Sequence, residues 1–334
     1  MQDSAGLEPL GSEDLRYIAS IVTMHHAKPS PPAEVVCFGM IVPATIVIVE
    51  RMPEVNFMSE FQQVFEHVSD DAAIVATLLP AWGVRSALAG TALGDDETGR
   101  RIVRALREAG VLGSFPMTPD YPTPYELVIS DAQGNRTYFW RKDDAVLATL
   151  DAADLSPVRD ASMLYVDWYD GHRIERAMDE AARYHVPVFL NVEHAHDEPP
   201  ILDLVARAAI CQAVTDATQQ GDDADDVADL VLDAGARTAI VTLARGGCLV
   251  AEAGRRVRVR APEVTAVDVS GAGATFSCGF ILGRLRGWNL EESARFAVAA
   301  ASLKCTVVGP RAFDLEEVHR LARSLAVEEG PVLR

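Results

Sequence analysis

Short apolar runs alternate with amphipathic segments through the second half of the chain. Runs of strand length are separated by segments whose apolar residues recur at helical spacing. The expected strands are 163–167, 186–192, 210–214 and 238–243, and the expected helices are 173–184, 201–208 and 224–234. Repeated βα units bury a parallel sheet between two helix layers and place ligands beyond the carboxyl ends of the strands. The pattern therefore predicts an α/β domain with a mostly parallel central sheet.

The first half of the chain predicts further strands of a different kind. Apolar runs occur at 34–38 and 46–49, and Tyr125 to Trp140 has the composition of a β-hairpin with a turn at 131–135. Helical spacing predicts two more helices, at 102–109 and 312–325.

We expect three segments along the chain. Residues 1–33 form an N-terminal extension, a short helix followed by a linker in which Lys28-Pro-Ser-Pro-Pro32 breaks the helical spacing. Residues 34–325 form the α/β domain, and residues 326–334 form a C-terminal tail.

The stretch from Ala266 to Phe280 joins an extended apolar run to a helix through a glycine turn. Gly271 and Gly273 allow the sharp turn, and the helix that follows points unpaired N–H groups and its positive dipole end at whatever precedes it. Gly271, Ala272 and Gly273 are therefore predicted to form an anion site. A strand-to-helix turn that binds nothing has the same local sequence.

The composition narrows the classes of partner. The 334 residues are 49% hydrophobic, and 30 basic against 49 acidic residues give a net charge of −19. Such a charge disfavours nucleic acid and anionic membranes, so we expect a small-molecule ligand. Five cysteines without a Cys-x-x-Cys pair predict reduced, buried thiols. With no signal peptide and no apolar run of about 18 residues, the expected location is cytoplasmic.

The order of motifs from Thr238 to Pro310 resembles the nucleotide half of the ribokinase (PfkB) family of sugar and nucleoside kinases. The motifs are Thr242-Leu-Ala-Arg-Gly-Gly247, Asp268-Val-Ser-Gly-Ala-Gly273 and the apolar helix that ends at Cys305. The resemblance implies a three-layer ribokinase-like sandwich with a small β lid from about 40–52 and 113–141, and a homodimer formed through the lid. It also implies ATP and Mg²⁺ as cofactors.

The same resemblance assigns roles to single residues. The positions implied to contact the nucleotide are Thr242, Ala244, Gly247, Asp268, Ala300 and Lys304. The positions implied to contact the substrate are Ala44, Asp70, Asp71, Ile74 and Arg136.

The catalytic position departs from the family pattern. The family signature ends in Gly-Ala-Gly-Asp, whose Asp takes the proton from the attacking hydroxyl, and Ala274 stands there in this chain. A methyl group accepts no proton, and losing a positioned general base costs about 10²–10⁴-fold in rate. The anion cradle is kept and the base is lost.

Substrate and cofactor positions depart as well. Ala44 replaces an Asp and Ile74 replaces an Asn, both of which bind sugar hydroxyls in the family. Asp70 and Asp71 stand where the family has a glycine pair, and Ala244 replaces a loop glycine. Thr218 replaces a Glu that organises the Mg²⁺ water, which puts the binding of both Mg²⁺ and ATP in question.

No metal site is predicted. The pair His25-His26 and the run Asn191-Val-Glu-His-Ala-His196 contain residue types that ligate metals. Neither has further ligands at a recognisable spacing.

Departures spread over sugar, metal, nucleotide and base positions indicate a kinase-fold protein without ordinary kinase activity, either a ligand-binding or regulatory protein or a repurposed enzyme. Asp70 and Asp71 then serve as acid/base groups or as anchors for a cationic substrate. Alternatively they are solvated acidic residues at a helix N-terminus, where the helix dipole favours negative charge. Arg136 faces phosphate or is a solvated strand-edge charge.

Two alternatives remain. The chain is an active ATP-dependent kinase for a sugar, nucleoside or related alcohol, whose base was removed by an engineered substitution at 274 or whose activity persists through positioning alone. Otherwise it is a structural partner in an oligomer that binds no small molecule.

Overall fold

The computed structural model describes residues 31–131, 136–141, 143–215 and 223–329. The predicted N-terminal extension lies outside these residues except for its last three positions, and so does Thr218. The described residues from Ala33 onward form one compact unit. None of the helices in the described ranges is both long and apolar enough to cross a bilayer.

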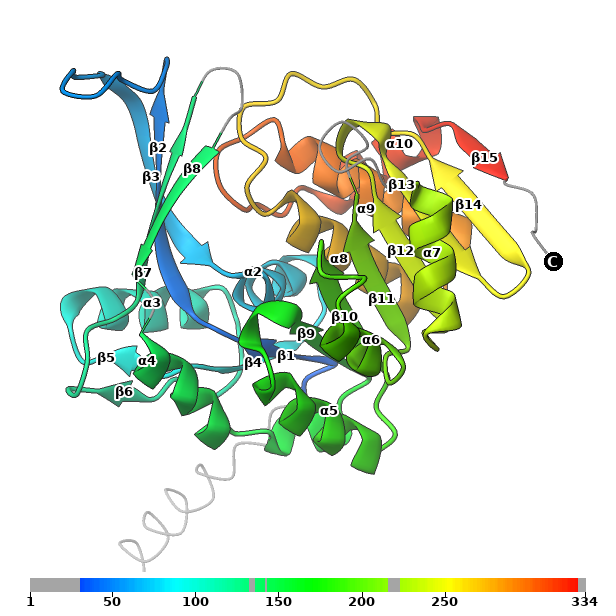
Figure 1. Cartoon of the computed structure of the whole chain (residues 1–334), viewed down its shortest axis with the longest axis horizontal. Helices are drawn as coiled ribbons and strands as arrows, with labels where there is room; N and C mark the ends of the chain where they lie inside the picture. Colours follow the sequence, from blue (N-terminus) through cyan, green and yellow to red (C-terminus); the bar gives the residue numbers. More distant parts are fainter. Residues whose placement is uncertain (1–30, 132–135, 142, 216–222, 330–334) are drawn as a thin grey trace, which may run out of the picture. The chain divides into compact units, whose positions relative to one another are not determined.

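A nine-stranded sheet forms the centre of this unit (Figure 1). The neighbouring strands β4, β1, β9, β10, β11 and β12 run parallel to one another. At the β12 edge the sheet continues with β13, β14 and β15, each antiparallel to its neighbour. In spatial order the strands are β15 (Val327–Glu329), β14 (Arg255–Val259), β13 (Cys248–Glu252), β12 (Thr238–Thr242), β11 (Ile210–Val214), β10 (Val188–Glu193), β9 (Met163–Asp167), β1 (Val35–Gly39) and β4 (Ser86–Gly90). The predicted mostly parallel sheet is confirmed.

Helices cover both faces of the sheet because its strands are apolar on both sides. Val35 and Cys37 of β1 belong to one buried cluster, whereas Val36 and Phe38 belong to the other. The first face carries α2 (Asp71–Leu78), α8 (Ala272–Leu285), α9 (Leu290–Lys304) and α10 (Leu315–Ser324), and the second carries α5 (Arg173–Arg183), α6 (Pro199–Val205) and α7 (Ala224–Asp233). The fold is the three-layer sandwich expected from the sequence.

A four-stranded lid stands at one side of the sheet domain (Figure 1). Its strands are, in spatial order, β3 (Phe61–Ser69), β2 (Val42–Val49), β7 (Tyr125–Ser130) and β8 (Arg136–Arg141). Side chains alternate between the two faces of a strand, and Ile46, Ile48 and Val128 form a buried cluster against which Val308 packs. The predicted hairpin of β7 and β8 is confirmed, and its turn at 132–135 lies outside the described residues.

Further elements lie along the chain between the sheet strands and the lid strands. They are β5 (Leu93–Gly94), α3 (Glu97–Glu108), β6 (Met117–Thr118) and α4 (Asp144–Ala148).

The run that was expected to be extended up to Asp268 is not a β-strand of the sheet. The N–H groups of Val267 and Asp268 donate to the carbonyl of Cys305, at 2.8 and 3.3 Å. Because these bonds go to the end of α9 rather than to a neighbouring strand, the segment is an extended loop, and α8 begins directly after the turn.

The strands that the sequence did not predict include β3, β4 and β15. The first six residues of β3 are exposed, so they lack the buried-strand pattern. β4 is a short run of small residues, and β15 pairs with β14 within the segment expected to be a tail. These strands are defined by their partners and not by their own hydrophobicity.

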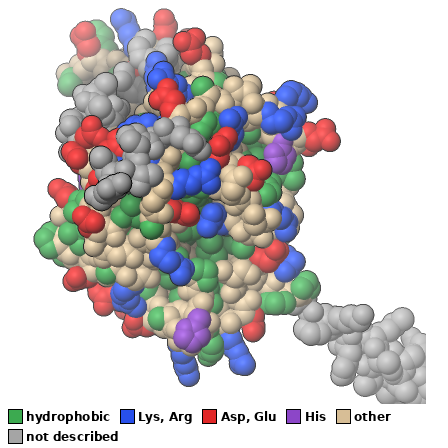
Figure 2. Space-filling view, turned by 90° about the vertical axis from the view of Figure 1, so that its right-hand side faces the viewer, with side chains coloured by type: hydrophobic (Ala, Val, Ile, Leu, Met, Phe, Trp, Pro, Cys, Tyr) green, Lys and Arg blue, Asp and Glu red, His purple; other side chains and the backbone are tan. Residues whose placement is uncertain are grey.

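Ion pairs join β14 to α7 at the antiparallel edge. Arg256 pairs with Asp225 at 2.7 Å and with Asp229, and Arg258 also pairs with Asp225. Figure 2, which looks at this side of the molecule, shows acidic and basic side chains interspersed. The described part of this face therefore presents no continuous basic surface of the kind that nucleic acid requires.

Candidate functional site

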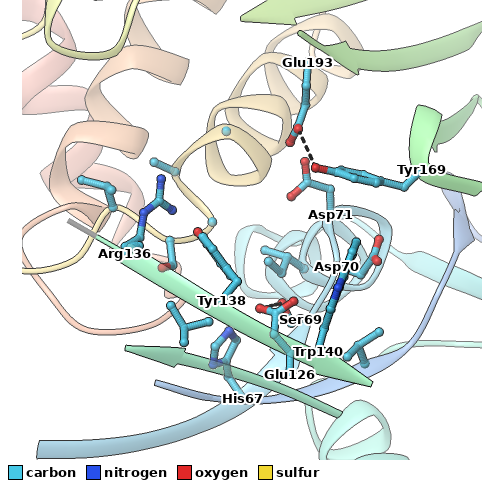
Figure 3. A pocket seen from close by; sticks show the side chains of 18 of the residues that line it. His67, Ser69, Asp70, Asp71, Glu126, Arg136, Tyr138, Trp140, Tyr169 and Glu193 are labelled. Atoms are coloured by element: carbon cyan, nitrogen blue, oxygen red, sulfur yellow. Dashed lines mark hydrogen bonds between the residues drawn. The ribbon is translucent and has the colours of Figure 1, made fainter. Parts of the chain in front are cut away.

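A cavity of ≈ 590 Å³ lies between the lid and the sheet domain. Lid strands supply one wall, and the first turns of α2 and α8 with the carboxyl end of β10 supply the other (Figure 3). The polar and aromatic lining residues are His67, Ser69, Asp70, Asp71, Tyr125, Glu126, Arg136, Tyr138, Trp140, Tyr169, Glu193, His194 and Ser270. Its position past the strand ends is where ligands of open α/β sheets bind.

The glycine turn forms part of this wall. Gly271 adopts φ +72° as the N-cap of α8, and a Cβ there would lie 3.2 Å from Cγ of Pro310. Ala272 and Gly273 line the cavity in the first turn of the helix. Since the first N–H groups of a helix have no partner within it, this turn presents donors and a positive dipole end to the cavity. The N–H group of Ala272 donates to the carbonyl of Val269 at 3.2 Å, and an anion site at this turn stays a prediction.

A buried ion pair holds the turn from behind. Nζ of Lys304 lies 3.0 Å from Oδ2 of Asp268 and donates to the Asp268 carbonyl at 2.6 Å. The carboxylate also accepts from the backbone N–H groups of Ser270 at 2.9 Å and Gly309 at 2.8 Å. Burial opposes ionisation of Asp268, but Lys304 and these N–H groups outweigh it and lower the pKa of Asp268. Burial lowers the pKa of Lys304.

The predicted nucleotide residues do not share this cavity. The ionic groups of Asp268 and Lys304 are committed to each other, and Ala300 is buried in the core. Oγ1 of Thr242 donates to the carbonyl of Ala213 at 3.3 Å. Nucleotide binding at these positions stays a prediction.

The loop after β12 keeps the backbone that glycine would adopt. Ala244 has φ +48° although it carries a Cβ. Gly247 has φ +94°, and a Cβ there would lie 1.9 Å from the carbonyl oxygen of Val259. The expected departure at 244 has therefore left the loop conformation in place, at a cost of about 1–3 kcal/mol for a residue held in a sparsely populated region.

Carboxylates gather at the α2 end of the cavity. Asp71 accepts from Nδ2 of Asn191 at 2.8 Å, and Glu193 accepts from the Tyr169 hydroxyl at 3.1 Å (Figure 3). Burial raises the pKa of Asp71 well above its usual range, and the charges of Glu193 and Asp70 raise it further. Asp71 therefore takes up a proton far more readily than an exposed aspartate.

Asp70 is held in a backbone conformation that favours glycine. Its φ of +77° and ψ of 140° lie close to a region that residues with a Cβ seldom enter. The resemblance assigns a glycine to this position, and the backbone here has a conformation that glycine favours.

Arg136 lies on the side of the cavity opposite Asp70 and Asp71 (Figure 3). Its guanidinium carbon is 5.6 Å from the centroid of the Tyr138 ring. Burial lowers the pKa of Lys304, and the positive charge of Arg136 contributes to that shift, so Arg136 lies within electrostatic reach of the turn before α8.

The structure brings together most of the substrate residues expected from the sequence. Asp70, Asp71, Ile74 and Arg136 line the cavity with the anion turn, whereas Ala44 and Ala274 are buried. Sequence reasoning missed Glu126, Tyr169 and His67, and it noted Glu193 only as a neighbour of histidines. The position of Glu193 at the end of a parallel strand is the signal that identifies it.

Within the described residues, no group of three or more His, Cys, Asp or Glu side chains is arranged to hold a metal ion. Mg²⁺ binding stays a prediction, and Thr218 lies outside the described ranges.

Comparisons with known proteins agree with this architecture. A family model described as "pfkB family carbohydrate kinase" matches residues 32–317. An ATP-dependent 6-phosphofructokinase of Thermoanaerobacterium thermosaccharolyticum is 24% identical over 235 residues, 66% of this chain and 73% of its own. An aminoimidazole riboside kinase of Salmonella typhimurium is 28% identical over 240 residues, 65% of this chain and 75% of its own.

Solved structures show the same fold. A candidate ribokinase of Agrobacterium tumefaciens superimposes with a TM-score of 0.78 at 25% identity, over 87% of this chain and 98% of its own. Arabidopsis thaliana ribokinase, solved with ribose and ATP, superimposes with a TM-score of 0.69 at 21% identity, over 87% of this chain and 99% of its own.

Replacing Asp70 by glycine should stabilise the protein. Asp70→Gly relieves a glycine-type backbone conformation, so we expect the free energy of unfolding to rise by about 1–3 kcal/mol in chemical denaturation. Asp71→Gly is the matched control, because it removes an equal charge from a helical position. An equal gain in both variants would assign the effect to charge repulsion and contradict backbone strain.

Breaking the buried pair should destabilise the turn. Lys304→Met leaves Asp268 buried without its cation, so the free energy of unfolding should fall by about 3–5 kcal/mol. Arg100→Met, which breaks the exposed pair with Asp95, should cost about 0–1 kcal/mol in the same titration. An equal loss in the free energy of unfolding for the two variants would show that the buried pair stabilises the protein no more than the exposed pair does.

The pair also predicts a pH dependence. The pKa of Asp268 is lower in the folded than in the unfolded chain, so its contribution is complete above the unfolded value of about 3.9 and is lost as the pH falls through the folded value. Unfolding titrations of the unaltered chain and Asp268→Asn should therefore converge in strong acid. A constant difference across that range would contradict this linkage.

Proposed function

Because this chain belongs to the PfkB family of carbohydrate kinases, we propose that its cavity binds a small hydroxylated ligand and that the chain does not transfer phosphoryl groups at an ordinary rate. The relatives it matches are named as kinases of sugar phosphates and nucleosides. The cavity occupies the space between lid and sheet domain. The cavity therefore supports binding of a hydroxylated ligand, whereas phosphoryl transfer to that ligand needs groups considered next.

One observation carries the loss of catalysis. The first turn of α8 holds no acidic residue, and the methyl group of Ala274 is fully buried. A proton acceptor on this turn would stand beside the anion site, where the attacking hydroxyl must lose its proton. In this chain the first turn of α8 keeps its backbone N–H groups, but it has no side chain that accepts the proton of the attacking hydroxyl.

The remaining groups favour binding. The first turn of α8 and Arg136 attract an anionic group, and the carboxylates of Asp71 and Glu193 accept hydrogen bonds from ligand donors. The lid strands close over the ligand and exclude water. Ile74 lines the wall without offering a hydrogen bond, so a sugar hydroxyl placed there loses about 1–3 kcal/mol on burial.

ATP would bind by resemblance at the loop that contains Thr242, Ala244 and Gly247. The glycine-type backbone retained at Ala244 supports this assignment. When bound, the nucleotide would supply the phosphoryl donor, and the chain's own groups would orient the acceptor.

A second candidate function is an active kinase with a relocated base. Asp71 lines the same cavity as the first turn of α8, and its raised pKa makes its carboxylate a stronger base than an exposed aspartate. This arrangement favours residual transfer to a sugar, nucleoside or related alcohol.

A direct assay separates the two functions. We expect the unaltered chain with ATP and Mg²⁺ to phosphorylate no common hexose, pentose or nucleoside at the 1–10³ s⁻¹ that is roughly typical of enzymes. We expect Ala274→Asp, with Ala274→Asn as matched control, to stay inactive, because Ile74 in the cavity wall still leaves the substrate unpaired. Ordinary turnover by the unaltered chain would refute the proposal, and strong turnover by Ala274→Asp alone would show a merely disabled kinase.

We also propose that two copies associate through the outer face of the lid. Successive side chains of a strand point to opposite faces of the sheet, and Ile46, Ile48 and Val128 point to the buried face of the lid. The apolar residues that point to the outer face are Val47, Val64, Leu127, Ile129 and Phe139. Val64 and Phe139 are 51% and 53% exposed. Contiguous exposed apolar surface of this kind marks an interaction site.

A charge on this face should prevent association. We expect the unaltered chain to have the mass of a dimer in light scattering coupled to size exclusion, and Phe139→Asp to have the mass of a monomer. Val264→Asp, at an exposed apolar position outside the lid, should remain dimeric. A monomeric unaltered chain would count against the lid interface.

A further inference from the structure

We infer that His67, on lid strand β3, forms a hydrogen bond with a hydroxyl group of the bound ligand and so determines which hydroxylated compounds the cavity accepts. This inference rests on the proposed binding function and adds to it a residue that sets specificity. The ligand class is a sugar or related polyol that keeps an uncharged hydroxyl on the side of the lid.

The strand register places His67 on the face of the lid that is turned to the cavity. His67 pairs with Ala44 of β2, which pairs with Glu126 of β7, and Glu126 in turn pairs with Trp140 of β8. Side chains of residues that are paired in register stand on the same face of a sheet. His67, Glu126 and Trp140 line the cavity, whereas Ala44 is buried (Figure 3). The polar groups that this row offers to a ligand therefore belong to the neighbours of Ala44.

One nitrogen of the His67 ring lacks a partner. Nδ1 is shielded from solvent and has no hydrogen-bond partner among the described residues. Its polar neighbours on the same face differ in this respect, because Ser69 donates to Oε1 of Glu126 at 3.3 Å. Since roughly nine in ten buried polar groups are hydrogen-bonded in folded proteins, an unpaired nitrogen in a cavity wall indicates a bond that a ligand completes.

The His67 ring is a neutral hydrogen-bonding group and not a cation. Burial lowers the pKa of His67 to about 4, although the charge of Asp268 opposes the shift, and Lys304 adds to it. A neutral imidazole has one N–H donor and one acceptor nitrogen. A hydroxyl matches it, since a hydroxyl both donates and accepts, whereas a phosphate group is better matched by a cation. The group that reaches His67 is therefore an uncharged hydroxyl.

A nitrogen in this situation discriminates between ligands by what they lack. A compound without the hydroxyl leaves Nδ1 of His67 unpaired in the complex, and a site built to bond a hydroxyl rejects the analogue that lacks it. In the empty protein the same unpaired nitrogen is destabilising, because a buried polar group without a partner has lost its hydration. His67 should thus weaken the empty protein and strengthen the complex.

Deoxy sugars test the inference on the full chain. Titration calorimetry at neutral pH measures D-ribose, D-fructose and the analogues of each that lack a single hydroxyl. For one analogue of a sugar that binds, we expect about three- to tenfold of the affinity loss to depend on His67, the factor that corresponds to one net hydrogen bond. This part of the loss should vanish in His67→Leu. The losses of the other analogues should be the same in His67→Leu and the unaltered chain.

Two further variants identify the nitrogen. His67→Asn keeps a polar atom on Cγ, where Nδ1 is attached, so it should retain part of the dependence on that hydroxyl. His67→Gln places its amide further from the backbone, near the position of Nε2, and should lose the dependence. Retention in His67→Gln alone would overturn Nδ1 as the bonding atom. His172→Leu, at an exposed histidine outside the cavity lining, should bind all the sugars as the unaltered chain does.

Thermal unfolding without ligand gives an independent readout. We expect His67→Leu to raise the melting temperature by about 2 °C or more, because it removes a buried nitrogen that has no partner. A histidine with a purely structural role would give the opposite shift. A lower melting temperature in His67→Leu would therefore overturn the proposal.

The remaining outcomes separate this inference from the proposed function. Binding of a sugar with no deoxy analogue whose loss depends on His67 would overturn the inference and leave the binding function standing. Binding of neither sugar by the unaltered chain would overturn both.

Discussion

The buried bond between Asp268 and Lys304 organises the candidate site. It connects the loop before α8 to the end of α9, and the same carboxylate collects the backbone N–H groups of Ser270 and Gly309. It thereby supports the turn at Gly271, which also lies close to Pro310 and Ile74. A fully buried pair of opposite charges is costly to form, and here its four hydrogen bonds place the first turn of a helix against a ligand space.

Some residues of this chain hold glycine-type backbone conformations although they carry a Cβ. Asp70 and Ala244 both occupy conformations suited to glycine, and Gly271 still makes the turn. Strain at positions of this kind persists only where the surrounding structure enforces it. The lid, the sheet and the helix starts supply that enforcement.

Much of the fold was predictable because its signals are local. The buried strands from 163 to 242 have apolar runs that need no partner to be recognised, and the glycine turn has its own signature. β3 and β15 were not predictable, since their exposed residues form strands only by pairing with β2 and β14. Only part of the residues that line the cavity could be predicted from the sequence. Asp70, Asp71 and Arg136 stood out in sequence, but Glu126 and Tyr169 join them only through the packing of the lid on the sheet.

One contact joins the lid to the ion pair. A Cβ at Gly309 would lie 2.7 Å from the ring of Phe65 on β3, so this ring rests directly on the glycine backbone whose N–H bonds to Asp268. The lid is thus seated on the same loop that fixes the anion turn. A methyl group at 309 would displace Phe65 and with it β3 of the lid from the cavity. The same methyl group would also disturb the hydrogen bond from the N–H of residue 309 to Asp268, which holds the loop before α8.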